Sequence, residues 1–159
     1  MKKWMIFWLS LALLLPSCRR AEAAGGSLDI LVTRVQNAIS SEEDFVIADA
    51  DFTVDHFGEP TFLQDAIVAL GNGKKTREFG LFRLKDRTKA AELKASVRQY
   101  LKGEQEALIS LSALYPTEEL EARLALYQNA TVGSEGMLVY YFVLDKKETK
   151  LAIEALTGR

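Results

Sequence analysis

The segment Met137–Leu144 constrains the fold most strongly, because it is a run of eight consecutive apolar residues. Valine and aromatic residues are frequent in this run, and these residue types favour β-strands. Successive side chains of a strand point to opposite faces of a sheet, so a strand that is apolar at every position leaves no face for solvent. The pattern therefore predicts a central strand that is buried on both faces.

Two β-hairpins are predicted, and this strand belongs to the second. Ala130–Val132 begins the second hairpin, and Gly133–Gly136 joins it to the central strand. The first hairpin consists of the runs Phe62–Leu70 and Thr76–Leu84 on either side of Gly71–Gly73. Two apolar runs that flank a glycine-rich turn are typical of a hairpin.

Helices are predicted around the hairpins, where apolar residues recur at steps of three and four. The apolar positions are Leu28, Leu31, Val32, Val35 and Ile39, then Leu93, Val97, Tyr100, Leu101, Leu108, Leu111 and Tyr115, then Leu120, Leu124 and Tyr127, and finally Leu151, Ala152, Ala155 and Leu156. Pro116 and Thr117 separate the second helix from the third, and Asp145 is the expected cap of the last. The order of elements predicts an α+β fold, with an antiparallel sheet of about four strands packed against helices.

The stretch from Ser41 to Pro60 has the least regular pattern. Phe45–Ile47 fits a short strand, while Asp49 fits the cap of a helical turn that Gly58 would close. The whole chain has 159 residues, 48% of them hydrophobic and 26% charged, and shows no internal repeat. These values predict one globular domain, residues 27–159.

The N-terminus has the layout of a signal peptide, residues 1–17. Lys2 and Lys3 precede the run Trp4–Leu15, which only Ser10 interrupts. A helix of twelve residues is about 18 Å long, whereas the hydrocarbon core of a bilayer is roughly 30 Å thick. Cleavage is therefore expected, rather than retention as an anchor helix.

The sequence Leu15-Pro16-Ser17-Cys18 resembles the lipobox of bacterial lipoproteins, although proline is less usual at its position. The resemblance implies a diacylglyceryl group on the Cys18 thiol and cleavage between Ser17 and Cys18. Two acyl chains hold a protein stably to a membrane. Residues 18–26 would then form a flexible tether, and the protein would lie on the outer face of the cell membrane.

A second resemblance involves the folded part. Glu78–Asp86, Tyr100-Leu101, Ala130–Val132 and Leu138–Leu144 are similar to segments of the bacterial lipoprotein family known as domain of unknown function 4358. That family consists of membrane-anchored proteins found mainly in Gram-positive anaerobes. The resemblance implies an anchored α+β domain and transfers no catalytic residue to this chain.

The sequence lacks the residues that several kinds of catalytic and metal-binding site require. Cys18 is the only cysteine and His56 the only histidine, which excludes disulfides within the chain and metal sites with two histidines. A calcium loop that starts at Asp49 would have Val54 in place of glycine and Pro60 in place of glutamate. The acidic residues around His56 are therefore interpreted as a capped, solvated turn, namely Asp49, Asp51, Asp55 and Glu59.

Phosphate-loop and serine-hydrolase motifs are also incomplete. Gly71–Thr76 departs from the phosphate-loop pattern, which would require glycine at Val68 and serine or threonine at Lys75, and no serine lies in a GxSxG elbow. The serines in helical repeats are interpreted as packing residues, namely Ser96, Ser110 and Ser112. The sequence thus predicts no catalytic residue, no metal site and no cofactor.

Removal of residues 1–17 takes away Lys2 and Lys3 and changes the net charge from −2 to −4, which argues against nucleic acid as a partner. The aromatic residues Phe79, Phe82 and Tyr140–Phe142 are interpreted as core, with an apolar ligand cleft as the alternative.

The sequence therefore predicts a non-enzymatic accessory or protein-interaction module of the cell envelope. Its expected partners are the bilayer, through Cys18, and an envelope protein. The alternatives are a small-ligand-binding lipoprotein and an envelope hydrolase. The sequence does not identify the residues of a partner surface.

Overall fold

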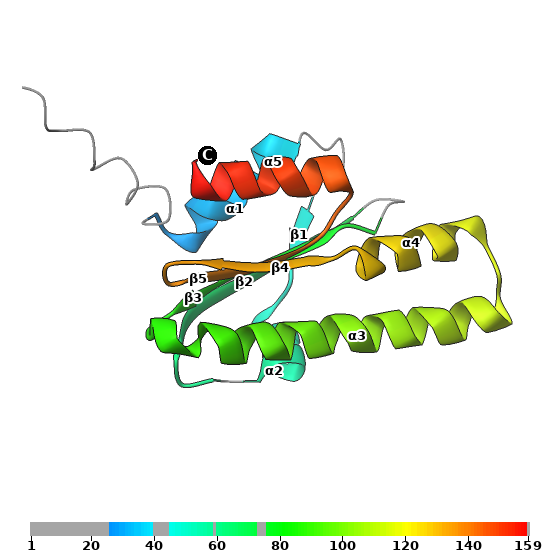
Figure 1. Ribbon diagram of the computed structural model, residues 1–159, viewed down its shortest axis with the longest axis horizontal. Helices are drawn as coiled ribbons and strands as arrows, with labels where there is room; N and C mark the ends of the chain where they lie inside the picture. The colour runs from blue at the N-terminus through cyan, green and yellow to red at the C-terminus, as the bar shows by residue number, and fades with distance from the viewer. Residues whose placement is uncertain (1–25, 40–44, 59, 73–75, 159) are drawn as a thin grey trace, which may run out of the picture.

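The computed structural model describes residues 26–39, 45–58, 60–72 and 76–158, which form one open antiparallel sheet with helices on both faces (Figure 1). The strands are β1 (Phe45–Ile47), β2 (Leu63–Gly71), β3 (Glu78–Leu84), β4 (Thr131–Glu135) and β5 (Leu138–Val143). The helices are α1 (Leu28–Ile39), α2 (Ala50–Phe57), the short 3-10 helix η1 (Arg87–Lys89), α3 (Ala90–Leu114), α4 (Glu118–Gln128) and α5 (Lys146–Thr157). The predicted α+β class is confirmed.

The strand order of the sheet is β1-β2-β3-β5-β4, and all neighbours are antiparallel. Both predicted hairpins are present, as β2-β3 and β4-β5. The strand beyond the four expected is β1, which pairs with the end of β2. Every residue of β5 is buried, as its apolar run predicts, although β3 rather than β5 occupies the middle of the sheet.

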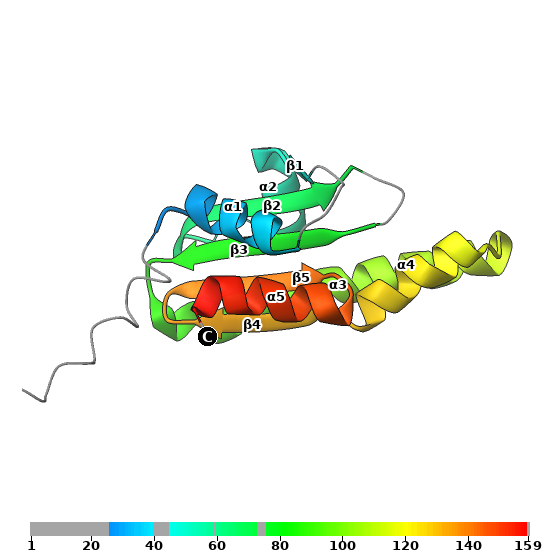
Figure 2. The same ribbon diagram turned by 90° about the horizontal axis from the view of Figure 1, so that it is seen from above.

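Each face of the sheet carries a separate apolar cluster, since side chains alternate along the strands. Helices α1 and α5 cover one face, where the cluster includes Phe79, Leu81 and Phe142. Helices α2, α3 and α4 cover the other face, where Phe82 and Tyr141 lie. Figure 1 shows the sheet between these two layers, and Figure 2 shows it face-on with α1 and α5 in front. None of the described helices is long and apolar enough to cross a membrane.

Local sequence signals explain the helix starts. Asp145 caps α5 through a capping box, in which its carboxylate accepts from the backbone N–H of Glu148 at 2.8 Å. Thr117 caps α4, and Asp49 caps α2 by accepting from the backbone N–H of Phe52 at 2.9 Å. The strand and the helical turn considered for the stretch after Ser41 are both confirmed.

One turn differs from its prediction. Gly133–Gly136 is expected from the sequence to be the turn of the second hairpin, but β4 continues through Gly133 to Glu135 and the chain turns at Gly136, where φ is +59°. The physical reason is the neighbouring Tyr140. Its ring covers Gly133, where an added Cβ would lie 2.4 Å from Tyr140 Cζ, so glycine serves here as a strand residue beneath an aromatic ring.

Candidate functional site

A buried carboxylate lies at the start of β3. Glu78 is 3% exposed and points to the face covered by α3 and α4. The hydroxyls of three tyrosines donate to it: Tyr100 of α3 at 2.9 Å, Tyr127 of α4 at 2.8 Å, and Tyr141 of β5. The carboxylate therefore joins two helices and a neighbouring strand to β3.

Gly80 makes the contact between Tyr141 and Glu78 possible. Gly80 is the register partner of Tyr141, and an added Cβ would lie 2.2 Å from Tyr141 Cε1. The ring therefore occupies the space that any side chain at Gly80 would fill. From there the hydroxyl reaches Glu78, two residues back along β3.

Burial sets the protonation of this cluster. Loss of solvation raises the pKa of Glu78 above its ordinary value, while the three tyrosine hydrogen bonds act in the opposite direction. Burial and the adjacent Glu78 carboxylate raise the pKa of Tyr100, Tyr127 and Tyr141. The tyrosines therefore remain protonated donors, and the cluster is a hydrogen-bonded tie within the core.

As the pH rises, the free energy of unfolding of the wild-type chain is expected to fall relative to that of Glu78→Gln. A carboxyl whose pKa is raised by folding contributes stability below its ordinary pKa of 4.5, and this contribution is lost as pH rises towards the folded value. The loss has a limiting slope of about 1.4 kcal/mol per pH unit. Urea unfolding across the range from acid to neutral pH, on a chain that begins at Ala24, measures the difference. A stability advantage of the wild type that is constant or grows with pH would contradict this interpretation.

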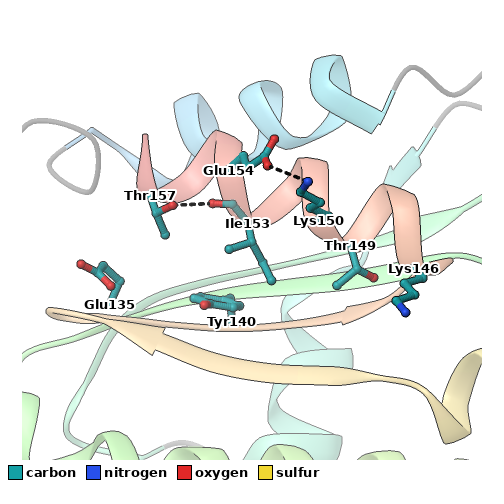
Figure 3. A pocket seen from close by; sticks show the side chains of 8 residues that line it. All are labelled: Glu135, Tyr140, Lys146, Thr149, Lys150, Ile153, Glu154 and Thr157. Carbon is teal, nitrogen blue, oxygen red and sulfur yellow. Dashed lines mark hydrogen bonds and ion pairs between the residues drawn. The ribbon is translucent and has the colours of Figure 1, made fainter. Parts of the chain in front are cut away.

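A groove of about 580 Å³ lies between α5 and the edge strand β4 (Figure 3). Tyr140 forms its floor, and Ile153 of α5 points towards that ring. Glu135 lies at one end of the groove and Lys146 at the other. The remaining lining residues come from α5, namely Thr149, Lys150, Glu154 and Thr157.

An exposed apolar surface, here called the hairpin tip, lies where α3 meets α4. It consists of Leu111, Leu114 and Tyr115, while the exposed Ile109 lies on the other side of α3 and is not part of it. Leu114 is 73% exposed and Tyr115 is 65% exposed. Helix α3 extends past the sheet at this end (Figure 1), so the sheet does not cover these residues. Leu111, Leu114 and Tyr115 are spaced by three and four residues and therefore share one side of the helix end.

The residues considered as a metal site do not converge. Asp49 is the cap of α2, as interpreted, and Asp51, Asp55 and His56 are exposed. The His56 ring lies against Phe52 and Tyr100, with ring centroids at 4.3 and 4.9 Å. Within the described ranges, no group of three His, Cys, Asp or Glu residues is placed to hold a metal ion. Glu59 lies outside those ranges.

The other sequence motifs have structural roles where they are described. Ser96 and Ser110 donate to carbonyl groups one helical turn earlier, at 3.5 and 2.9 Å. Ser110 is exposed, so its interpretation as a packing residue is wrong, whereas Ser96 and Ser112 are partly buried. The aromatic residues Phe79, Phe82, Tyr141 and Phe142 are fully buried, which confirms their interpretation as core, while Tyr140 is 8% exposed and also lines the α5–β4 groove. Ser17, Cys18 and residues 73–75 of the Gly71–Thr76 loop lie outside the described residues.

Sequence reasoning missed the Glu78 cluster and the hairpin tip, and it gave an apolar cleft lined by Tyr140 only as an alternative, without its walls from α5 and β4. One signal pointed to the first of these, since Glu78 begins a strand whose residues are otherwise mostly apolar. A charged residue there requires partners, but the sequence does not show which tyrosines approach it. The hairpin tip depends on how far α3 extends beyond the sheet, which periodicity does not reveal.

These features define the architecture of the protein. It is an α+β domain with a helical hairpin that extends beyond its sheet. Comparison with protein families, with curated proteins and with solved structures finds no match for the chain.

Proposed function

We propose that the protein is a lipid-anchored, non-enzymatic accessory protein of the cell envelope that binds another envelope protein through its hairpin tip. The observation that carries the proposal is the exposed apolar surface formed by Leu111, Leu114 and Tyr115. Exposed apolar patches on soluble domains are often sites of protein association. The proposal retains the expected lipid on Cys18, the location outside the cell membrane, and the resemblance to the lipoprotein family.

The position of the hairpin tip suits a partner away from the membrane. Helix α1 begins at one end of the molecule, and the turn between α3 and α4 lies at the opposite end (Figures 1 and 2). A lipid on Cys18 would hold the end at which α1 begins, because residues 19–26 span at most about 29 Å. The hairpin tip would then point away from the bilayer.

Charge indicates the chemistry of the partner. Between Lys102 and Arg123 the chain has five glutamates and no lysine or arginine. Glu118 and Glu121 are exposed in the first turns of α4, next to the apolar tip. Such a surface repels anionic lipid headgroups and suits a protein surface with an apolar centre and basic rim.

Site-specific photocrosslinking in intact cells tests this proposal. A photoreactive residue at Leu114 is expected to capture one envelope protein. The same residue at Ile30, which is 50% exposed on α1, is the matched control and is expected not to capture it. Adding Glu118→Lys and Glu121→Lys is expected to reduce capture from Leu114 at least about fivefold, since reversed rim charges weaken association.

Two results would contradict the proposal. One is equal capture of the same protein from Leu114 and from Ile30, which would mean that the hairpin tip is not the binding surface. The other is capture that does not change when Glu118 and Glu121 are reversed.

A further inference from the structure

The outer edge of β4 is open. This strand lies at the end of the sheet order and pairs with β5 along its inner edge. In the part of the chain that the structure describes, no strand lies beside its outer edge. An edge strand presents backbone N–H and C=O groups that a further strand can bind.

The α5–β4 groove lies next to this open edge. Its apolar part is formed by the Tyr140 ring and by Ile153, which points towards that ring in Figure 3. Gly133 has no side chain to fill the space above β4, and the Tyr140 ring covers it. The groove therefore offers a backbone edge on one side and an apolar surface beneath α5 on the other.

We propose that this groove binds an extended peptide segment of a partner protein, which adds to the sheet as a strand beside β4. Extended peptides bind in this way when an open strand edge supplies backbone hydrogen bonds and a neighbouring pocket accepts alternate side chains. The inference goes beyond the proposed function, because it uses a different surface from the hairpin tip.

The direction of the added strand and the charges at the two ends of the groove together define the composition of the peptide. The proposed strand runs antiparallel to β4, as every neighbouring pair within this sheet does. Its N-terminal end then lies near Glu135 and its C-terminal end near Lys146. The matching segment has a basic residue first, apolar residues at alternate positions, and an acidic residue last.

Two defined peptides test the inference on the mature lipidated protein, residues 18–159, in nanodiscs. The first is Arg-Ser-Val-Ser-Val-Ser-Asp with blocked ends, and the second has its arginine and aspartate exchanged. The first is expected to bind about tenfold more tightly, because two rim charges favour it. Binding is expected to slow hydrogen exchange of the backbone amides of Thr131–Glu135.

Charge reversal of the groove supplies the matched control. In the double variant Glu135→Lys, Lys146→Glu the preference between the two peptides is expected to invert. Lys147→Glu makes the same change on the same turn of α5 but outside the groove lining, and is expected to leave the preference unchanged.

Three results would overturn the inference. These are no protection of the β4 amides at millimolar peptide, a preference that the double variant leaves unchanged, and a dimer in which β4 pairs with a second copy of the chain. Leu114→Glu at the hairpin tip is expected to leave peptide binding intact. Failure of the groove and failure of the hairpin tip are therefore distinguishable.

Discussion

Gly80→Ala is expected to lower the free energy of unfolding by about 3 kcal/mol, through overpacking and the loss of a buried hydrogen bond. The added Cβ would lie 2.2 Å from Cε1 of Tyr141, which is fully buried. The ring must therefore move, and with it the hydroxyl that donates to Glu78. Urea unfolding of a chain that begins at Ala24 measures the change.

Gly103→Ala is the matched control for this substitution. Gly103 is exposed within α3, and an added Cβ there meets nothing within 4 Å. The same chemical change is expected to raise the free energy of unfolding by about 0.5–1 kcal/mol, because alanine favours a helix over glycine. Equal effects at the two glycines would contradict the role of Gly80.

A double substitution separates the clash from a general effect on the strand. Tyr141→Val removes the ring that the new methyl group would meet. The combined loss in Gly80→Ala, Tyr141→Val is expected to be smaller than the sum of the single losses by more than about 1 kcal/mol, since the effects of contacting residues are not additive. Additive losses would show that the two residues act independently.

Local signals were sufficient to predict most of the fold. The run Met137–Leu144 predicted a strand buried on both faces, and helical spacing predicted the buried side of α1. The prediction of about four strands did not count β1 in the sheet, although Phe45–Ile47 was considered as a short strand, because β1 has only three residues and gains its partner from β2. Local sequence patterns also could not predict the order of the strands in the sheet, because that order depends on contacts between distant segments.

The candidate sites were less predictable than the fold. Glu78 receives hydrogen bonds from residues 22, 49 and 63 positions later in the chain. No local motif encodes such spacing. Glycine is common in turns, yet Gly80 and Gly133 each lie in a strand beneath a tyrosine ring. Glycine therefore signals a close approach as well as a turn, and only the folded arrangement distinguishes the two.

Cys18→Ala is expected to abolish lipid attachment completely. Cys18 is the only cysteine in the chain, so no other thiol can accept a diacylglyceryl group. The substitution is also expected to leave the precursor uncleaved between Ser17 and residue 18, because the resemblance to the lipobox implies that lipidation precedes cleavage. Ser96→Ala, a similar small substitution in the folded part, is the control and should leave labelling unchanged.

Metabolic labelling with palmitate is the most direct test of the central claim, that the protein acts from a lipid anchor outside the cell membrane. The expected result is label on the wild-type protein and on Ser96→Ala, and neither label nor processing in Cys18→Ala. Label that persists in Cys18→Ala, or a wild-type protein that carries none, would contradict the claim.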